Sequence, residues 1–160
     1  MRTNELVVTS HLGAPADVVW DAVTTMEGVN FELGPWLRMT APAGVRLDPE
    51  LVTPGERLFR SRLLLGGVLP IDFDDLTFVA IGPSSFHERS RMLSARVWEH
   101  ERHVEPDGPR CFLTDRVWFD PRVRLAAPLQ RRIVRAVFQH RHERLNQRFG
   151  ARRRPGATAG

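Results

Sequence analysis

Apolar and polar residues alternate through the middle of the chain with the period of two that is typical of β-strands. A run rich in β-branched residues at 5–12 predicts a first strand. Six further strand-like runs follow, separated by turn-forming glycine, proline, serine and aspartate. These runs lie at about 35–39, 56–65, 68–81, 85–92, 95–105 and 110–119. Because short turns join consecutive runs, we expect an antiparallel sheet.

Helical patterns lie on either side of these strands. Pro15 and Asp17 suit the first turn of a helix, and Gly28 is suited to end it. Residues 29–35 leave room for only one further helical turn. Residues 125–149 predict a long final helix whose apolar side chains fill an arc of about 220°. That arc is wider than a surface helix needs, so we expect the sheet to enclose this helix over much of its length.

The order of elements is a strand, one or two helices, six strands and a long helix, which predicts the α+β class. We expect a curved antiparallel sheet wrapped around the C-terminal helix. With 160 residues, 42% of them hydrophobic, the chain can fill one core, and two would each be small. We therefore expect a single ligand-binding domain over residues 1–150 and a disordered basic tail over residues 151–160.

Composition favours a cytoplasmic protein. No stretch reaches the roughly 18 uninterrupted apolar residues of a membrane helix, and no apolar export segment follows Met1. The single cysteine, Cys111, excludes an internal disulfide, which suits a reducing compartment.

Charge is divided unevenly along the chain. Residues 1–120 hold 12 arginines and 18 acidic residues, a net −6, whereas residues 121–160 hold 11 arginines and one acidic residue, a net +10. Such asymmetry can mark an anionic partner, so a regulatory or interaction protein that uses the basic C-terminal helix is one hypothesis. A solvated basic helix with a loose tail explains the same pattern. Because the arginines are not interleaved with exposed aromatics, we do not expect nucleic-acid binding.

The turn at 106–109 predicts a register for its two strands. Centred between Asp107 and Gly108, it places Trp98 opposite Val117 and His100 opposite Asp115. This face of the strands is the more apolar one, so we expect it to be concave.

The turn at 82–85 predicts a second register, in which Ile81 faces Phe86 and Val79 faces Glu88. Together the two registers and the final helix predict the wall of a cavity. Its ligand-binding residues are expected to be Val79, Ile81, Phe86, Glu88, Trp98, His100, Asp115, Val117, Phe119, Val137 and Arg141.

A small polar group is expected inside this apolar wall: Glu88, His100 and Asp115, approached by Arg141 from the helix. A carboxylate facing an imidazole can orient it and raise its pKa, which is what a general base needs, so His100 and Asp115 are the catalytic candidates. The same residues could instead form a buried, self-satisfied network or anchor a ligand. The residues themselves leave these roles open.

Metal and cofactor chemistry find no support in the sequence. His100 and His103 point to opposite faces of a strand, and His140 and His142 diverge on a helix, so we expect no metal site. No nucleophile elbow, phosphate-binding glycine loop or dinucleotide fingerprint is present, so we expect no cofactor.

Several local motifs, in this order, resemble the START-like superfamily, also called SRPBCC, and within it a bacterial subgroup of ligand-binding proteins. They are Ala14-Pro15-Ala16-Asp17-Val18-Val19-Trp20, Pro35-Trp36-Leu37-Arg38, Trp98-x-His100, Thr114-Asp115-x-Val117 and Phe138-x-x-Arg141-His142-x-x-Leu145. The resemblance covers about residues 4–149. It implies a helix-grip fold with a cavity between the concave sheet and the last helix, and it implies no universal catalytic residue.

Two functions from different classes follow. The leading hypothesis is a module that binds a small hydrophobic molecule, such as a lipid, a polyketide or an aromatic metabolite. The alternative is an enzyme of the polyketide cyclase or dehydratase type that uses His100 and Asp115 as a general base. The sequence leaves the oligomeric state open, and a homodimer is compatible with it.

Overall fold

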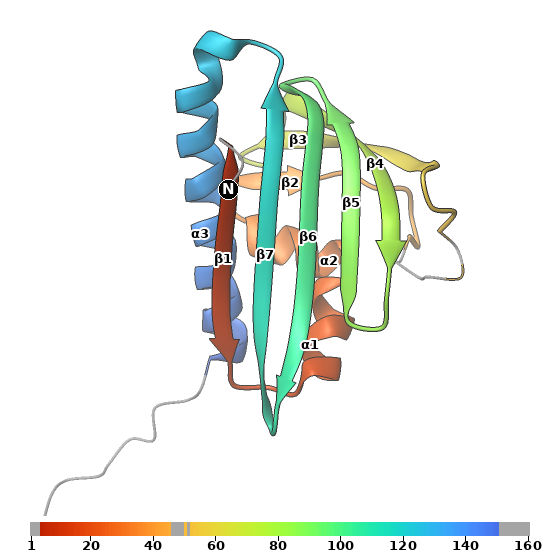
Figure 1. Ribbon diagram of the computed structural model, residues 1–160, viewed down its shortest axis with the longest axis vertical. Coiled ribbons are helices and arrows are strands. Elements are labelled where there is room, and N and C mark those ends of the chain that lie inside the picture. Colours follow the sequence, from red (N-terminus) through yellow and green to blue (C-terminus); the bar gives the residue numbers. More distant parts are fainter. Residues whose placement is uncertain (1–3, 46–49, 51, 151–160) are drawn as a thin grey trace, which may run out of the picture.

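A seven-stranded antiparallel sheet curls beside one long helix (Figure 1). The computed structural model describes residues 4–45, 50 and 52–150. Its strands are β1 (Glu5–Leu12), β2 (Leu37–Met39), β3 (Arg57–Leu65), β4 (Leu69–Ile81), β5 (Ser85–Met92), β6 (Ala95–Asp107) and β7 (Arg110–Pro121). They lie in the order β1-β7-β6-β5-β4-β3-β2, so both sheet edges come from the N-terminal part of the chain. The predicted α+β class is confirmed. The predicted tail, residues 151–160, lies outside the described residues.

Two short helices and one long helix cover the concave side of this sheet: α1 (Ala16–Val23), α2 (Met26–Leu33) and α3 (Ala127–Phe149), the last preceded by the 3₁₀ turn η1 (Arg124–Ala126). The prediction that Gly28 ends a helix is wrong. Thr25 has extended backbone and interrupts the helical run, and its hydroxyl accepts a hydrogen bond from the Gly28 N–H at 3.0 Å. Gly28 therefore lies in the first turn of α2, which contacts both α3 and β2.

The final helix is buried on one face only from Val134 onward. Phe138 and Leu145 are 2% and 1% exposed, whereas Leu129 and Ile133 are 62% and 53% exposed. The prediction that the sheet encloses α3 over much of its length is therefore wrong for the first two turns, before Val134. Leu129 and Ile133 line a cavity instead of packing against the sheet.

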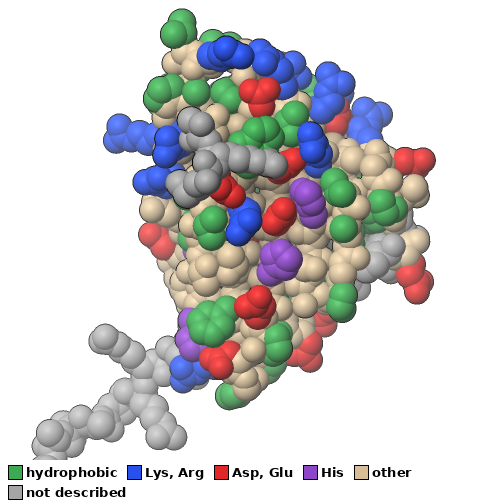
Figure 2. Space-filling model, in the orientation of Figure 1, with side chains coloured by type: hydrophobic (Ala, Val, Ile, Leu, Met, Phe, Trp, Pro, Cys, Tyr) green, Lys and Arg blue, Asp and Glu red, His purple; other side chains and the backbone are tan. Residues whose placement is uncertain are grey.

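On the face shown in Figure 2, acidic, basic and histidine side chains are interspersed over the sheet, and arginines gather near the end where β7 leads into α3. Arg131, Arg132 and Arg135 on α3 are exposed, as expected for a solvated basic helix.

The register between β6 and β7 differs from the predicted one. The turn is centred between Gly108, whose φ is +59°, and Pro109, so His100 pairs with Val117 and Arg102 pairs with Asp115. Moving the turn centre by one residue shifts every pair by two, and the inward face of each strand is unchanged.

A β-bulge lies between Phe78 and Ala80, where β4 pairs with β5. The predicted pair of Ile81 with Phe86 is present, but Glu88 pairs with Phe78 and not with Val79. The bulge turns Phe78 inward, where it is 1% exposed, and leaves Val79 on the outside at 42% exposed.

Candidate functional site

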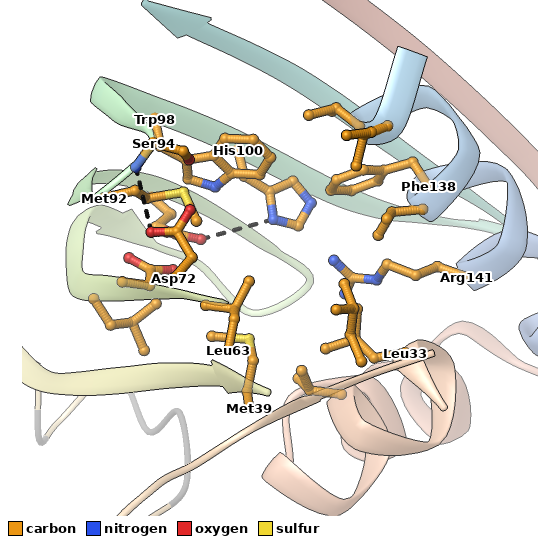
Figure 3. Close-up of a pocket in the computed structure, with 18 of the residues that line it drawn as sticks. Leu33, Met39, Leu63, Asp72, Met92, Ser94, Trp98, His100, Phe138 and Arg141 are labelled. Atoms are coloured by element: carbon orange, nitrogen blue, oxygen red, sulfur yellow. Dashed lines mark hydrogen bonds and ion pairs between the residues drawn. The ribbon is translucent and has the colours of Figure 1, made fainter. Parts of the chain in front are cut away.

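A cavity of about 510 Å³ lies between the concave face of the sheet, α2 and the first half of α3 (Figure 3). Most of its wall is apolar, with Leu63 and Trp98 from the sheet, Leu33 from α2 and Phe138 from α3. Its exposed lining residues include Ile71 at the start of β4, Val123 just before η1, and Leu129 and Ile133 on α3. The mouth of the cavity therefore opens at the end of the molecule where α3 begins.

Some of the residues predicted to line the cavity do line it. The residues that line the cavity are Phe86, Glu88, Trp98, His100, Val137 and Arg141. Ile81 packs in an apolar cluster beside Phe86 and lies outside the cavity lining. Val79 is outside because of the bulge.

Asp115, Val117 and Phe119 face the interior but do not line the cavity. They lie on β7, and α3 packs against β7 and β1, so Val117 and Phe119 join a core cluster that includes Phe138. The prediction failed here because it treated the whole concave face as cavity wall. The helix covers one side of that face and leaves the other side open.

Arg102 lies at the centre of a buried polar network. Its side chain is 0% exposed and donates two hydrogen bonds to Glu32, both at 2.8 Å, and two to Asp115, both at 2.7 Å. Arg141 Nε donates to Glu32 Oε2 at 2.8 Å. Such paired carboxylates can compensate the cost of burying a guanidinium.

The network continues from Asp115 toward the N-terminal strand. His142 Nε2 lies 3.0 Å from Asp115 Oδ2, and its Nδ1 lies 2.8 Å from Ser10 Oγ. Side chains from β1, α2, β6, β7 and α3 are thereby joined in one network.

Electrostatics keep both acidic members of the network charged. Burial alone would raise the pKa of Asp115, but Arg102 and then His100 outweigh it and hold that pKa well below its usual range. Burial also opposes ionisation of Glu32, and Arg102 and Arg141 together lower the pKa of that carboxyl. The network therefore contains ionised, hydrogen-bonded carboxylates at neutral pH.

His100 lies between two carboxylates. Its Nε2 is 2.8 Å from Asp115 Oδ1 and its Nδ1 is 3.7 Å from Glu88 Oε2. The rings of Phe86 and Phe138 contact the imidazole edge-on, each with centroids 5.1 Å away. The predicted contact between His100 and Asp115 is present, although the two residues are diagonal neighbours and not a directly opposed pair.

A second acidic group lies in the cavity wall. Asp74 on β4 and Glu88 on β5 are 4% and 5% exposed, and Ser90 Oγ donates to Glu88 Oε1 at 2.7 Å. Burial first, and the neighbouring Glu88 carboxylate second, raise the pKa of Asp74 well above its ordinary value. The burial of Asp74 and its neighbouring carboxylate therefore both disfavour the ionised form of Asp74.

Sequence reasoning missed Glu32, Asp74, Arg102 and His142 as site residues. Arg102 had a usable signal, since the period of two that turns His100 inward also turns Arg102 inward. Glu32 had none, because its partner Arg102 lies 70 residues away in the sequence, whereas His142 belongs to the motif Phe138-x-x-Arg141-His142-x-x-Leu145 that carries the family resemblance.

Among the described residues, no group of three or more His, Cys, Asp or Glu side chains is placed to hold a metal ion. No helix within the described residues is long and apolar enough to cross a membrane.

Comparison with known proteins places the fold. The model of the family described as "Domain of unknown function (DUF8410)" matches residues 10–149. No curated protein matches the chain.

Similar solved structures include a START superfamily protein from Mycobacterium smegmatis, with a TM-score of 0.66, 13% identity, and 91% of this chain and 96% of that chain covered. A protein from Chromobacterium violaceum gives a TM-score of 0.69 at 12% identity, with 92% of this chain and 98% of that chain covered. The Zhui aromatase/cyclase from Streptomyces sp. R1128 gives 0.67 at 16% identity, covering 98% of each chain. The predicted START-like helix-grip fold is therefore confirmed.

Proposed function

Because the chain belongs to the DUF8410 family, whose description names no activity, we propose a function from the cavity itself: the protein binds a small hydrophobic molecule between its sheet and α3. The observation that carries this proposal is the cavity of about 510 Å³ with a mainly apolar wall. Ligand pockets of about 300–1,000 Å³ bury most of a drug-sized molecule. A short lipid, a polyketide or an aromatic metabolite fits this description.

The fold supports the proposal by analogy. A START superfamily protein and an aromatase/cyclase have the same arrangement of sheet and final helix. Fold does not determine function, so this analogy alone does not identify the ligand. The class of ligand is inferred from the residues that line the cavity of this chain.

Binding is better supported than general-base catalysis by His100 and Asp115. A general base needs a free nitrogen within about 2.6–3.2 Å of the proton that it removes. Nε2 of His100 is hydrogen-bonded to Asp115, which is 0% exposed, and Nδ1 faces the Glu88 carboxylate at 3.7 Å, an ion-pair distance beyond hydrogen-bond reach. We therefore propose structural and anchoring roles for this pair.

The cellular location and the domain organisation of the protein are also proposed. We propose that residues 1–150 form one domain, that the protein acts in the bacterial cytoplasm, and that it does not bind nucleic acid. The single thiol, Cys111, is buried and unpaired, which is compatible with a reducing compartment.

Filling the cavity tests the proposal. Val137 lines the cavity, whereas Gln139 on the same helix is exposed, so Val137→Trp blocks the space and Gln139→Trp adds the same ring outside it. Titration with the apolar dye anilinonaphthalene sulfonate, followed by fluorescence, should show saturable binding that is at least about tenfold weaker in Val137→Trp and unchanged in Gln139→Trp. Native mass spectrometry of freshly purified protein should detect a bound apolar molecule in the parent chain. No saturable binding, or equal loss in both variants, would defeat the proposal.

A further inference from the structure

Arg141 is a buried arginine whose guanidinium has few partners. The residue is only 8% exposed, yet it donates one hydrogen bond, from Nε to Glu32 Oε2 at 2.8 Å, and its Nη2 lies 2.8 Å from the same oxygen. A guanidinium carries five N–H donors. Arg102, which contacts the same Glu32, donates four hydrogen bonds. Within the described part of the chain, the Nη1 group of Arg141 therefore has no acceptor.

The guanidinium of Arg141 faces the cavity. Its side chain keeps 10% of its surface exposed and belongs to the cavity wall. Figure 3 shows it pointing from α3 into the space between His100 and Leu33. The Phe138 ring, 4.9 Å from the guanidinium carbon, offers a cation–π contact but no acceptor oxygen. A ligand in the cavity can therefore reach the unpaired N–H groups of Arg141.

Holding Glu32 does not explain why Arg141 is buried. Arg102 already donates a hydrogen bond at 2.8 Å to each oxygen of that carboxylate. Burying a second guanidinium is unfavourable when its N–H groups lack acceptors. Water in the open cavity can accept from these groups, but a ligand that displaces the water has to supply the acceptor itself. The missing acceptor therefore indicates a feature of the ligand.

The charges around the cavity favour a neutral acceptor over an anion. Three acidic residues line the cavity: Asp72, Asp74 and Glu88. Two more, Glu32 and Asp115, contact the arginines from behind the wall. Even with Asp74 uncharged and both His100 and His142 protonated, the remaining four acids balance the two histidines and two arginines. The wall and its network then have no net positive charge to attract a ligand carboxylate.

We propose that the ligand is an apolar molecule with a neutral carbonyl group, such as a ketone or an ester, whose oxygen accepts a hydrogen bond from Arg141 Nη1. A carbonyl oxygen can accept two hydrogen bonds, donates none and carries no net charge. The hydrocarbon body contacts the apolar wall while the polar contact orients it, as the few polar groups of an apolar pocket usually do. This inference rests on the proposed binding function and names the ligand class of the same cavity.

The test compares naphthyl methyl ketone with the isopropenylnaphthalene substituted at the same position, which has the same shape but a methylene group in place of the carbonyl oxygen. Naphthoate is the anionic probe, and calorimetry measures the three dissociation constants. In the parent protein the ketone should bind at least about tenfold more tightly than the alkene, because the alkene displaces water and leaves a buried donor unpaired. Naphthoate should bind no more tightly than the ketone.

Two matched variants assign the preference for the ketone. Arg141→Met removes the N–H donors and keeps an unbranched side chain, while Arg102 still holds Glu32. The preference should then fall below about twofold. Arg144→Met is the control, because Arg144 lies on the same helix, donates to the Phe31 carbonyl and lies outside the cavity lining. It should keep the preference within about threefold of the parent value.

Infrared spectra of the bound ketone give a second readout that does not need a stable Arg141→Met variant. Isotope labelling of the carbonyl separates the band of the ligand from the amide bands of the protein. A hydrogen bond from a guanidinium lowers the frequency of a carbonyl stretch. In the parent protein the band should therefore lie below its position in an apolar solvent.

The outcomes separate the two proposals. If neither neutral naphthalene binds saturably, the proposed binding function fails, and this inference fails with it. If both bind with equal affinity, or if the preference for the ketone survives in Arg141→Met or is lost equally in Arg144→Met, binding stands and the carbonyl inference is overturned. Naphthoate that binds more tightly than the ketone also overturns it, and so does a carbonyl band that stays at its position in an apolar solvent.

Discussion

Arg102 is buried completely, and its guanidinium lies between two carboxylates that are as buried as it is. Each partner comes from a different part of the chain, Glu32 from α2 and Asp115 from β7. A buried ion pair of this kind adds little net stability over a well-packed apolar pair, but removing one member leaves an uncompensated charge in the interior. The network is therefore costly to break.

Arg102→Met should lower the free energy of unfolding by about 3–5 kcal/mol, because Glu32 and Asp115 are left buried without their main partner. The comparison is Arg96→Met, where the arginine is half exposed and pairs loosely with Asp120 at 3.5 Å. That change should stay within about 0.5 kcal/mol. Urea unfolding followed by circular dichroism measures both. Equal effects would mean that Arg102 contributes no more than a surface arginine.

His100→Ala tests the structural role of the imidazole. The change removes the hydrogen bond of His100 to Asp115 and its ion-pair contact with Glu88. We expect a loss of about 1–3 kcal/mol in the free energy of unfolding. His103→Ala, on the exposed face of the same strand, is the control and should cost less than about 0.5 kcal/mol. Chemical denaturation checks the difference. Unchanged stability with weaker dye binding would instead assign His100 to the ligand alone.

At the residue scale, strand alternation carried the sequence prediction furthest. It turned Trp98 and His100 inward correctly, and the error in the turn centre did not matter because it moved the pairs by two. The contact between His100 and Asp115 therefore survived a wrong register. Glu32 could not be predicted, since nothing local in α2 indicates that its carboxylate meets an arginine 70 residues later.

The junction of α1 and α2 is the element that sequence patterns described least well. Two threonines interrupt the helical run. The Thr24 hydroxyl donates a hydrogen bond to the Trp20 carbonyl, and the Thr25 hydroxyl caps the N-terminus of α2. Gly28 follows in the first turn, where its backbone lies against Ala22. A glycine that permits close approach and a glycine that ends a helix are alike in sequence.

Gly28→Ala should therefore destabilise the protein. The added Cβ would overlap the carbonyl oxygen of Ala22, which belongs to the backbone and can move only if α1 and α2 separate. We expect a loss of about 1–3 kcal/mol, typical of overpacking, although alanine favours helices elsewhere. Glu27→Ala, at the exposed neighbouring position, is the control. Thermal unfolding measures both, and a Gly28→Ala variant as stable as the parent would show that the junction has room.

The bulge in β4 shows a second limit of predicting elements from the sequence, because the inward and outward positions of a strand change at a bulge. Strand alternation assigns either Phe78 or Val79 to the inside, and both are good strand residues. The extra residue of a bulge reverses the alternation on one side of it, and no glycine marks the place. The predicted pairing of Ile81 with Phe86 beside the turn therefore held, although Ile81 does not line the cavity, whereas the inward position predicted for Val79 was wrong.

The whole molecule has a packed end and an open end. At the packed end, Leu145 of α3 joins Val19 of α1 and the ends of β6 and β7 in one core cluster (Figure 1). At the other end, the first turns of α3 stand away from the sheet and border the cavity.

The pH dependence of global stability follows from buried acids that shift in opposite directions. Asp115 and Glu32 have lowered pKa values, so their contribution is present above the pKa of the unfolded chain and is lost as pH falls through the folded pKa. Asp74 has a raised pKa, so its contribution is present below its ordinary value of 3.8 and is lost as pH rises toward the folded pKa. Stability should therefore fall on both sides of a mildly acidic optimum.

Asp74→Asn should remove the loss on the alkaline side alone. Below pH 3.8 the variant and the parent should be about equally stable, because Asp74 is protonated in both the folded and the unfolded parent chain. Above that pH the variant should gain on the parent by up to about 1.4 kcal/mol per pH unit until the folded pKa is reached. Asp75→Asn gives the opposite sign, because Arg60 is the first cause that lowers the pKa of Asp75. Denaturant unfolding across a pH series measures both differences, and a constant gap between Asp74→Asn and the parent would mean that Asp74 is ionised in the folded protein.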